Sequence, residues 1–272
     1  MEVNKMSEVN LKAKVHITGK IRAITGIAVG GAGGALEIGG VDNPIIRNPL
    51  SNEPYIPGSS LKGKLRSLLE KFLGKELNYK VTKTPLIRIH RCDNEEDYLN
   101  CPVCIIFGSS EKEINKPSRL IVRDSFLVDG AEYSKQELAD KGDLPYSELK
   151  TETIIDRITA QAMPRDLERV PAGAEFNLDL IFDLYNKKDV DFLKHLFKAM
   201  RLLEDDYIGG SGTRGSGQIE FTDISMNIKE QKYYDSGEYV ERFEKINGDN
   251  DKIKKILQNI ESIQNKLVDL VQ

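Results

Sequence analysis

The sequence predicts an α+β fold whose core elements follow the order strand, helix, strand, strand, helix, strand. Three features of its 272 residues support this prediction. Four segments alternate apolar and polar residues, which is typical of half-buried strands, and two segments repeat apolar residues every three or four positions, which is typical of amphipathic helices. Loops rich in glycine and proline separate these segments. The order is that of a ferredoxin-like βαββαβ core.

The six core elements can be placed from these patterns. Strands are expected over residues 9–25, 120–128, 175–184 and 219–226, and helices over residues 61–73 and 190–204. Ser59 or Ser60 is expected to cap the first helix, and Gly74 to end it. The predicted ferredoxin-like core therefore covers residues 9–226.

Three further segments are expected outside this core. Residues 78–115 and 150–172 are polar insertions, and the first of them contains all the cysteines. Residues 235–272 are expected to form a C-terminal helical extension, with one apolar helix over residues 253–270. Whether this helix packs on its own domain or on a neighbouring subunit stays open at this point.

The composition limits the class of protein. A hydrophobic content of 39% supports a buried core, and a net charge of −4 means that any nucleic-acid surface must be local. The chain has three cysteines, no secretory signal pattern and no apolar run of bilayer length. It is therefore expected to be cytoplasmic, with no membrane partner.

A glycine-rich loop before the last strand is a candidate phosphate site. Five glycines surround Arg214, namely Gly209, Gly210, Gly212, Gly215 and Gly217. Glycine allows backbone amides to approach an anion closely, and a guanidinium adds charge. Gly210 to Gly215 match G-x-G-x-x-G, but a dinucleotide site would require a helix after the loop, and a strand pattern follows. A simple tight turn is the alternative.

A second anion site is possible at the start of the first helix. Residues 58–64 match the opening of a P-loop, but Leu65 stands where a hydroxyl ligand of Mg²⁺ should be, which disfavours an NTPase. The helix N-terminus, with Lys62 and Arg66 nearby, can still attract phosphate. A capped surface helix with solvated basic side chains is the alternative.

The first insertion carries a metal-binding pattern. His90 and Cys92 are followed by Cys101 and Cys104 in a C-x-x-C motif. Four such ligands suit tetrahedral zinc and leave no open position, so the predicted site is structural. Three reduced cysteines beside a surface histidine, or a disulfide, are the alternatives.

Two further patterns are compatible with phosphate chemistry. Asp42 follows two Gly-Gly pairs, and a carboxylate beside a phosphodiester can hold Mg²⁺; an Asx turn before the next proline is the alternative. Arg157, Arg165 and Arg169 of the second insertion can clamp phosphates, although such charged loops are often merely solvated.

The remaining histidines give no catalytic signal. His16 lies in a strand pattern and is expected to be packed or exposed, and His195 lies one turn from Asp191 and is expected to be solvated. No Ser/His/Asp or Cys/His arrangement stands out.

Three long motifs occur together, in order, in one known family. They are PYIPGSSLKGKLRSLLE (residues 54–70), TIIDRITAQAMPRDLERV (residues 153–170) and LLEDDYIGGSGTRGSGQIEF (residues 202–221). Over residues 9–226 the chain resembles the repeated backbone subunit of type III-A CRISPR–Cas (Csm) effector complexes, of the RAMP superfamily. The cysteine insertion and the tail after Tyr233 are less typical of that family.

The resemblance implies a fold and a set of partners. The core would be ferredoxin-like and RRM-like, and copies would stack into a filament on a CRISPR RNA with other subunits of the complex. The family's guide-binding elements correspond to Lys62, Arg66 and the loop 209–217. Its thumb hairpin, which separates guide and target strands at regular intervals, corresponds to residues 156–170.

The resemblance also implies cleavage of target RNA. The family's catalytic aspartate lies in an I/V-D-x-P motif, which here is Val41-Asp42-Asn43-Pro44, so Asp42 is the matching residue. The implied reaction uses the 2′-hydroxyl of the target RNA as nucleophile and needs Mg²⁺ or another divalent ion. The alternatives are a non-catalytic guide-binding scaffold and a guide-processing endonuclease, which usually requires a well-placed histidine.

Overall fold

The computed structural model describes residues 10–30, 44–111, 114, 116–236, 241–243 and 252–270. Asp42, with most of the first glycine-rich segment, lies outside the described residues. Within the described part of the chain, no helix is long and apolar enough to cross a membrane.

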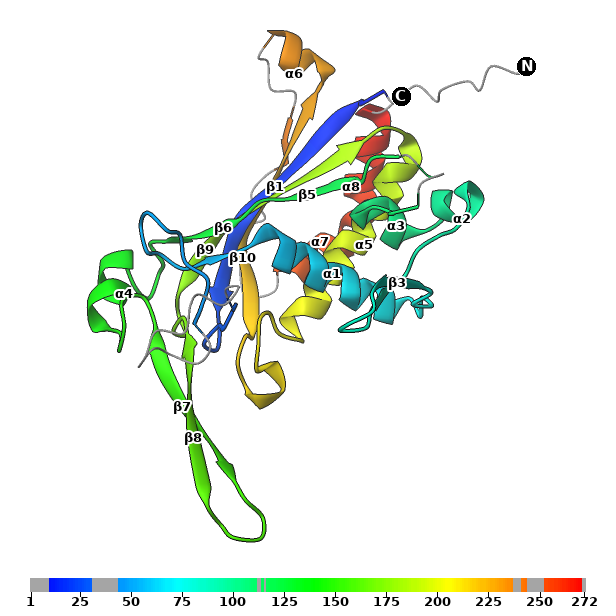
Figure 1. The fold of residues 1–272 in the computed structure, drawn as a ribbon. Coiled ribbons are helices and arrows are strands. Elements are labelled where there is room, and N and C mark those ends of the chain that lie inside the picture. Colours follow the sequence, from blue (N-terminus) through cyan, green and yellow to red (C-terminus); the bar gives the residue numbers. More distant parts are fainter. Residues whose placement is uncertain are drawn as a thin grey trace.

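An antiparallel sheet, seven-stranded within the described residues, forms the centre of the protein (Figure 1). Its strands lie in the order β11 (Glu241–Phe243), β10 (Ile219–Glu230), β1 (Ala13–Ala23), β9 (Glu175–Leu184), β6 (Ser125–Val128) and β2 (Tyr55–Ile56), and β5 (Leu120–Val122) also pairs with β9. Two separate hairpins are formed by β3 (Tyr79–Thr82) with β4 (Ile87–Ile89) and by β7 (Glu148–Ile155) with β8 (Ala162–Arg169).

Helices cover one face of this sheet. The described residues form the helices α1 (Gly58–Phe72), α2 (Glu95–Leu99), α3 (Pro102–Phe107), α4 (Lys135–Lys141), α5 (Lys187–Glu204), α6 (Gln231–Ser236), α7 (Lys252–Gln258) and α8 (Ile260–Leu270), with a 3₁₀ turn over Gly212–Arg214. Figure 1 shows α1, α5, α7 and α8 together on one side of the sheet, and α5 contacts α1, α7, α8, β9 and β10.

The main core lies between the sheet and these helices. On β1, Val15, Ile17 and Ile21 are fully buried, while the residues between them are only partly buried. Such alternation is expected when helices cover one face of an antiparallel sheet and leave the other open. Leu196 and Met200 of α5 belong to the same buried cluster. The amphipathic patterns in the sequence therefore marked the core correctly.

The start of α1 differs from the prediction. The helix begins at Gly58, and neither Ser59 nor Ser60 caps it through its side chain. Instead, the amide of Gly58 donates to Oδ1 of Asp124 at 2.7 Å. A carboxylate at this end is favoured by the helix dipole. Asp124 lies where the predicted strand over 120–128 is interrupted between β5 and β6.

The C-terminal segment forms two helices, and the prediction of one continuous helix was wrong. α7 and α8 meet at Asn259, whose side-chain amide donates to the carbonyl of Lys255 at 3.1 Å. The backbone amide of Asn259 donates to the carbonyls of both Lys255 and Ile256, a shared bond that is common at the end of a helix. Both helices pack on α5, where Gln264 donates to the carbonyl of Val190 at 3.0 Å. The described part of this segment therefore packs on its own domain.

The insertion over 150–172 is a long hairpin, β7–β8, that projects from the body (Figure 1). At its tip, Oδ1 of Asp156 accepts hydrogen bonds from the amides of Ile158 and Thr159. At its base, Val170 and Ile27 exchange backbone hydrogen bonds of 2.8 and 2.9 Å. The hairpin is thus ordered at both ends although most of its residues are exposed.

The insertion over 78–115 has two parts of different character. The β3–β4 hairpin is mostly exposed. By contrast, Tyr98 of α2 and Val103 and Ile106 of α3 are fully buried in the main core. The cysteine-bearing part of the insertion is therefore joined to the main core.

Candidate nucleic-acid interface and metal centre

A pocket of about 260 Å³ lies where three distant segments of the chain meet. Gly30 and Pro44, which border the segment that carries the predicted catalytic aspartate, line one part of it. Ser211 and Arg214 of the glycine-rich loop and Arg165 of β8 line other parts. The fold thus brings together three regions that the sequence singled out separately.

The carboxylate of Glu152 on β7 holds the basic groups of this pocket together. It lies 2.9 Å from Nε of Arg214, 3.3 Å from Nη2 of Arg165 and 3.4 Å from Nζ of Lys150. Burial acts to raise the pKa of Glu152, but hydrogen bonds from Lys150 and Arg165 and the charge of Arg214 outweigh it and lower that pKa. The three cations outnumber the single charge of Glu152, which suits a phosphate beside them, although the carboxylates of Asp166 and Glu168 also line the pocket.

The glycine-rich loop uses most of its amides internally. The amides of Gly210 and Gly217 donate to the carbonyls of Ala28 and Gly26, and the amide of Gly215 donates to Gly212 within the loop. These amides are not open to a phosphate in this conformation. Steric packing also explains one of the glycines, because a Cβ at Gly212 would lie 1.9 Å from the ring of Tyr207. The loop is therefore a tight turn that presents Arg214, and phosphate binding at this loop stays a prediction.

The N-terminus of α1 is also satisfied from within the protein. Asp124 occupies the position that an external anion would take. Nζ of Lys62 donates to the carbonyl of Leu120 at 2.7 Å, and burial, followed by the charge of Arg66, lowers its pKa. Neither group points freely at solvent in this structure.

Arg66 is engaged entirely with protein groups. Its Nε donates to Oε1 of Glu70 at 2.9 Å, its Nη1 to the carbonyl of Gly108 at 3.0 Å and its Nη2 to the carbonyl of His90 at 2.7 Å. Its side chain is only 16% exposed. Its predicted role in RNA binding is untested, but the contacts seen here join α1 to the first insertion.

The other predicted arginines lie along the hairpin. Arg157 is exposed at the tip, while Arg169 at the base pairs with Glu148 at 2.6 Å and donates to Oγ of Ser216 at 3.4 Å. Arg165 lies between them and faces the pocket. These three side chains are therefore spread over the length of the hairpin and do not form one cluster.

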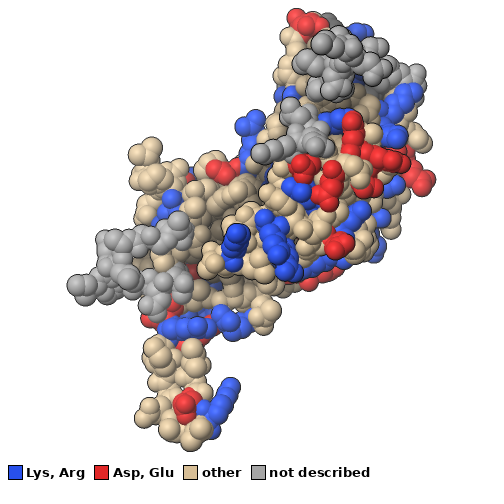
Figure 2. Space-filling model, turned by 45° about the vertical axis from the view of Figure 1, so that its right-hand side comes forward, with Lys and Arg blue, Asp and Glu red and all other residues tan. Residues whose placement is uncertain are grey.

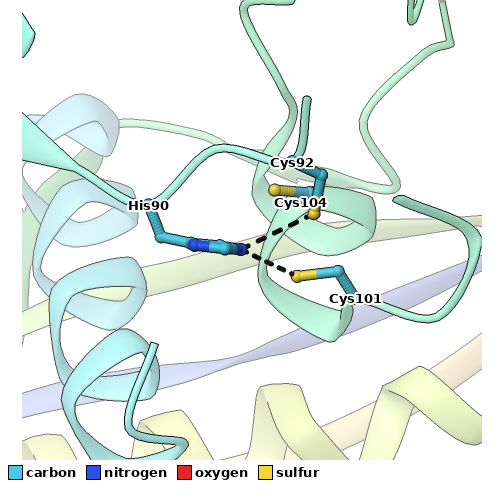
Figure 3. A group of neighbouring side chains, drawn as sticks. All are labelled: His90, Cys92, Cys101 and Cys104. Atoms are coloured by element: carbon cyan, nitrogen blue, oxygen red, sulfur yellow. Dashed lines mark hydrogen bonds between the residues drawn. The ribbon is translucent and has the colours of Figure 1, made fainter. Parts of the chain in front are cut away.

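The four predicted metal ligands come together (Figure 3). Their ligand atoms all lie within 4.8 Å of one another, and Nε2 of His90 is 3.4 Å from Sγ of Cys101 and 3.6 Å from Sγ of Cys92. Tetrahedral zinc with bonds of about 2.0–2.3 Å places its ligand atoms roughly 3.5–4 Å apart. Nδ1 of His90 is 3.0 Å from the carbonyl of Glu76, which leaves Nε2 free for a metal.

The three thiols do not ionise together. A hydrogen bond with Cys104 lowers the pKa of Cys101 to about 4, burial raises the pKa of Cys92 to about 11, and the interaction with Cys101 raises the pKa of Cys104. Only one thiolate is therefore stable in this buried cluster by itself. A bound divalent cation would stabilise all three thiolates, so the donor set fits a metal.

The histidines outside this cluster have no catalytic arrangement. Nε2 of His16 has no hydrogen-bond partner among the described residues, and burial lowers its pKa. The prediction that His195 is solvated was wrong. Its side chain is half-buried, its Nδ1 is buried, and burial followed by the charges of Lys198 and Lys194 lowers its pKa to about 4.

Charge is distributed unevenly over the surface. Figure 2 shows Lys and Arg side chains along the middle of one face and across the base of the projecting hairpin, while Asp and Glu side chains gather at the upper right of the view. This agrees with the expectation of a local basic surface on a chain of net charge −4.

Comparison with known proteins identifies the family. The model of the RAMP superfamily matches residues 20–220. A relative from Methanocaldococcus jannaschii, called CRISPR system Cms endoribonuclease Csm3, is 41% identical over 237 residues, which cover 86% of this chain and 88% of the relative. The chain belongs to the Csm3 family of the RAMP superfamily. The resemblance stated from the three motifs is confirmed.

Other Csm3 proteins agree with this assignment. The Csm3 endoribonuclease of Enterococcus italicus is 42% identical over 217 residues, covering 79% of this chain and 92% of the relative. Among solved structures, a chain of a Csm3–Csm4 subcomplex of the type III-A CRISPR–Cas interference complex has a TM-score of 0.57 and 29% identity, and the match covers 93% of this chain and 97% of that one. Methanopyrus kandleri Csm3 has a TM-score of 0.60 at 20% identity, over 94% and 98% of the two chains, and shows likeness of fold.

Some residues of the candidate sites were missed by sequence reasoning. Glu152 was not singled out, because nothing in a strand of alternating polarity indicates that one carboxylate will meet three cations. Lys150 was counted only as part of a polar excursion. Asp124 lies 66 residues after Gly58, the first residue of the helix that it caps. The sequence does show a cation-rich insertion and a glycine-rich loop. Only the fold shows that Glu152 pairs with cations from both of them.

Proposed function

We propose that this chain binds a CRISPR RNA as a filament-forming subunit of a type III-A effector complex and cleaves target RNA paired with that guide. Further copies of the chain and the other subunits of the complex are its protein partners. The names of the Csm3 relatives support an endoribonuclease activity. The pocket at which three segments of the chain meet supports the location of the cleavage site. Because the guide RNA is inside the cell, we place this protein in the cytoplasm.

The observation that carries this proposal is the pocket itself. Gly30 and Pro44 line it together with Arg165 and Arg214. Asp42 lies outside the described residues, two positions before Pro44. A carboxylate supplied from this segment would meet a phosphodiester held by the two guanidinium groups, and phosphate contacts of this kind do not depend on base sequence.

Each group then has a distinct task in cleavage. The guanidinium groups of Arg165 and Arg214 hold phosphates of the paired RNA, and the hairpin orients the target backbone so that its 2′-hydroxyl can approach in line with the leaving oxygen. Asp42 would hold Mg²⁺ or another divalent ion, which would supply stabilisation of the charge on the phosphate oxygens. Specificity comes from base pairing between guide and target, as in other RNA-guided systems.

The remaining parts of the proposal concern architecture. The strand order β10, β1, β9, β6 with α1 and α5 on one face supports a ferredoxin-like, RRM-like core over residues 9–226. Residues 150–172 act as the thumb, and residues 235–272 are an extension of the core. His90, Cys92, Cys101 and Cys104 hold a structural zinc ion, which the spacing of their donor atoms supports.

The test is the substitution Asp42→Ala in the assembled complex. We expect loss of target-RNA cleavage, by at least about 100-fold, while guide RNA stays bound, because the substitution removes one carboxylate and no cation. Asp140→Asn, an exposed α4 residue that accepts from Gln136, is the matched control and should cleave normally. Equal cleavage by the Asp42→Ala and parent complexes would refute the assignment.

A further inference from the structure

Arg66 lies between the two halves of the cysteine–histidine cluster. One pair of ligands, His90 and Cys92, follows strand β4, and the other pair, Cys101 and Cys104, belongs to α3. Nη2 of Arg66 donates to the carbonyl of His90, and Nη1 donates to the carbonyl of Gly108, which ends α3. One guanidinium group therefore contacts both ligand-bearing segments.

The carboxylate of Glu70 completes this arrangement. Its Oε1 accepts from Nε of Arg66 at 2.9 Å and from the amide of His90 at 3.2 Å. The Glu70 side chain is 6% exposed, so its charge depends on these donors. Arg66 and Glu70 are one turn apart on α1, and together they fix the backbone of His90 through both its amide and its carbonyl.

We propose that Arg66 is a positioning residue of the metal centre, which it fixes to helix α1, and that phosphate binding is not its task. This inference rests on the structural metal proposed above. Groups that orient metal ligands through hydrogen bonds typically change metal affinity 10- to 100-fold when they are removed. Here the guanidinium also sets the distance between the two ligand pairs, because it bridges their backbones.

The geometry explains why an arginine is needed. Its three nitrogen atoms point at three acceptors in a planar fork, which the single ammonium of a lysine cannot reproduce. Without the guanidinium, two partly buried carbonyls lose their donors and Glu70 loses its counter-charge. The contacts of Arg66 also link the metal centre to α1, the helix that carries Lys62.

The experiment compares Arg66→Lys with the parent full-length chain loaded with zinc. Release of zinc to a chromogenic chelator is followed over time, and cobalt(II)-loaded samples are recorded by visible absorption, which reports the coordination geometry. We expect Arg66→Lys to release zinc at least about 10-fold faster and to shift the cobalt bands. Arg88→Lys, in the exposed β4 strand two residues before His90, is the matched control and should match the parent in both measurements.

The outcomes separate this inference from the proposed function. The inference is overturned if folded Arg66→Lys protein releases zinc at the parental rate and shows the parental cobalt bands. It is also overturned if this variant keeps its metal but loses affinity for RNA. If Arg66→Lys does not fold, the same two measurements are made on Glu70→Gln, which keeps an acceptor for the His90 amide but removes the counter-charge of Arg66. Parental zinc release and parental cobalt bands in Glu70→Gln overturn the inference. A parent chain that binds no metal overturns the metal centre itself, whereas failure of Asp42→Ala to stop cleavage leaves the Arg66 inference intact.

Discussion

At the scale of single residues, the candidate interface depends on which basic side chains are held by buried protein acceptors and which stay exposed. Arg66 and Lys62 are engaged by internal acceptors, while Arg214 is 52% exposed and shares Glu152 with Arg165 and Lys150. A phosphate that enters the pocket must compete with the Glu152 carboxylate for these cations. Glu152 therefore keeps the cations in place and limits the affinity for RNA at the same time.

Glu152→Gln tests this balance. We expect tighter RNA binding at low salt, with a salt dependence whose slope is steeper by about one, because one more cation is available to release counterions. The measurement is fluorescence anisotropy of labelled RNA over a salt series. Glu137→Gln, which removes the same charge from α4, should change neither quantity. An unchanged slope in Glu152→Gln would show that its cations do not contact phosphate.

At the scale of secondary-structure elements, the sequence predicted periodic features well and long-range partners poorly. The burial pattern of β1 and the apolar stripe of α5 follow from alternation and helical spacing. The cap of α1 could not be predicted, because Asp124 reaches Gly58 only after β5 and α1 have packed together. The four metal ligands were predictable because their spacing is local. The additional pairing of β11 with β10 and of β2 with β6 could be seen only in the structure.

The α1 cap gives a direct test at this scale. We expect Asp124→Ala to lower the free energy of unfolding by about 1 kcal/mol, since an amide at the positive end of the helix loses its acceptor. Ser60→Ala should have an effect of only a few tenths of a kcal/mol, as Ser60 forms no side-chain cap. Denaturant titration of both variants measures the difference. A larger loss in Ser60→Ala than in Asp124→Ala would contradict the structure.

At the scale of the whole molecule, one continuous core joins the sheet, α5 and the metal-bearing segment. Cys92, Cys101 and Cys104 belong to the same buried cluster as Ile17 of β1 and Leu196 of α5. The projecting β7–β8 hairpin, by contrast, contributes mainly exposed residues. A change at the metal centre should therefore reach the entire fold, whereas a change at the hairpin tip should not.

Metal removal distinguishes a joined core from an independent module. We expect chelation to lower the midpoint of thermal unfolding by about 5 °C or more while the transition stays single, because α3 packs on α1 and α5 and each kcal/mol corresponds to about 2–4 °C in a protein of this size. Differential scanning calorimetry measures both quantities, and re-addition of zinc should restore the parental midpoint. Cys104→Ser should reproduce the chelated state without chelator, because it removes one of four ligands. The contrary outcome is a separate transition at low temperature while the midpoint of the main transition stays unchanged. The metal-bearing segment would then unfold alone, and its burial in the common core would contribute little to the stability of the sheet.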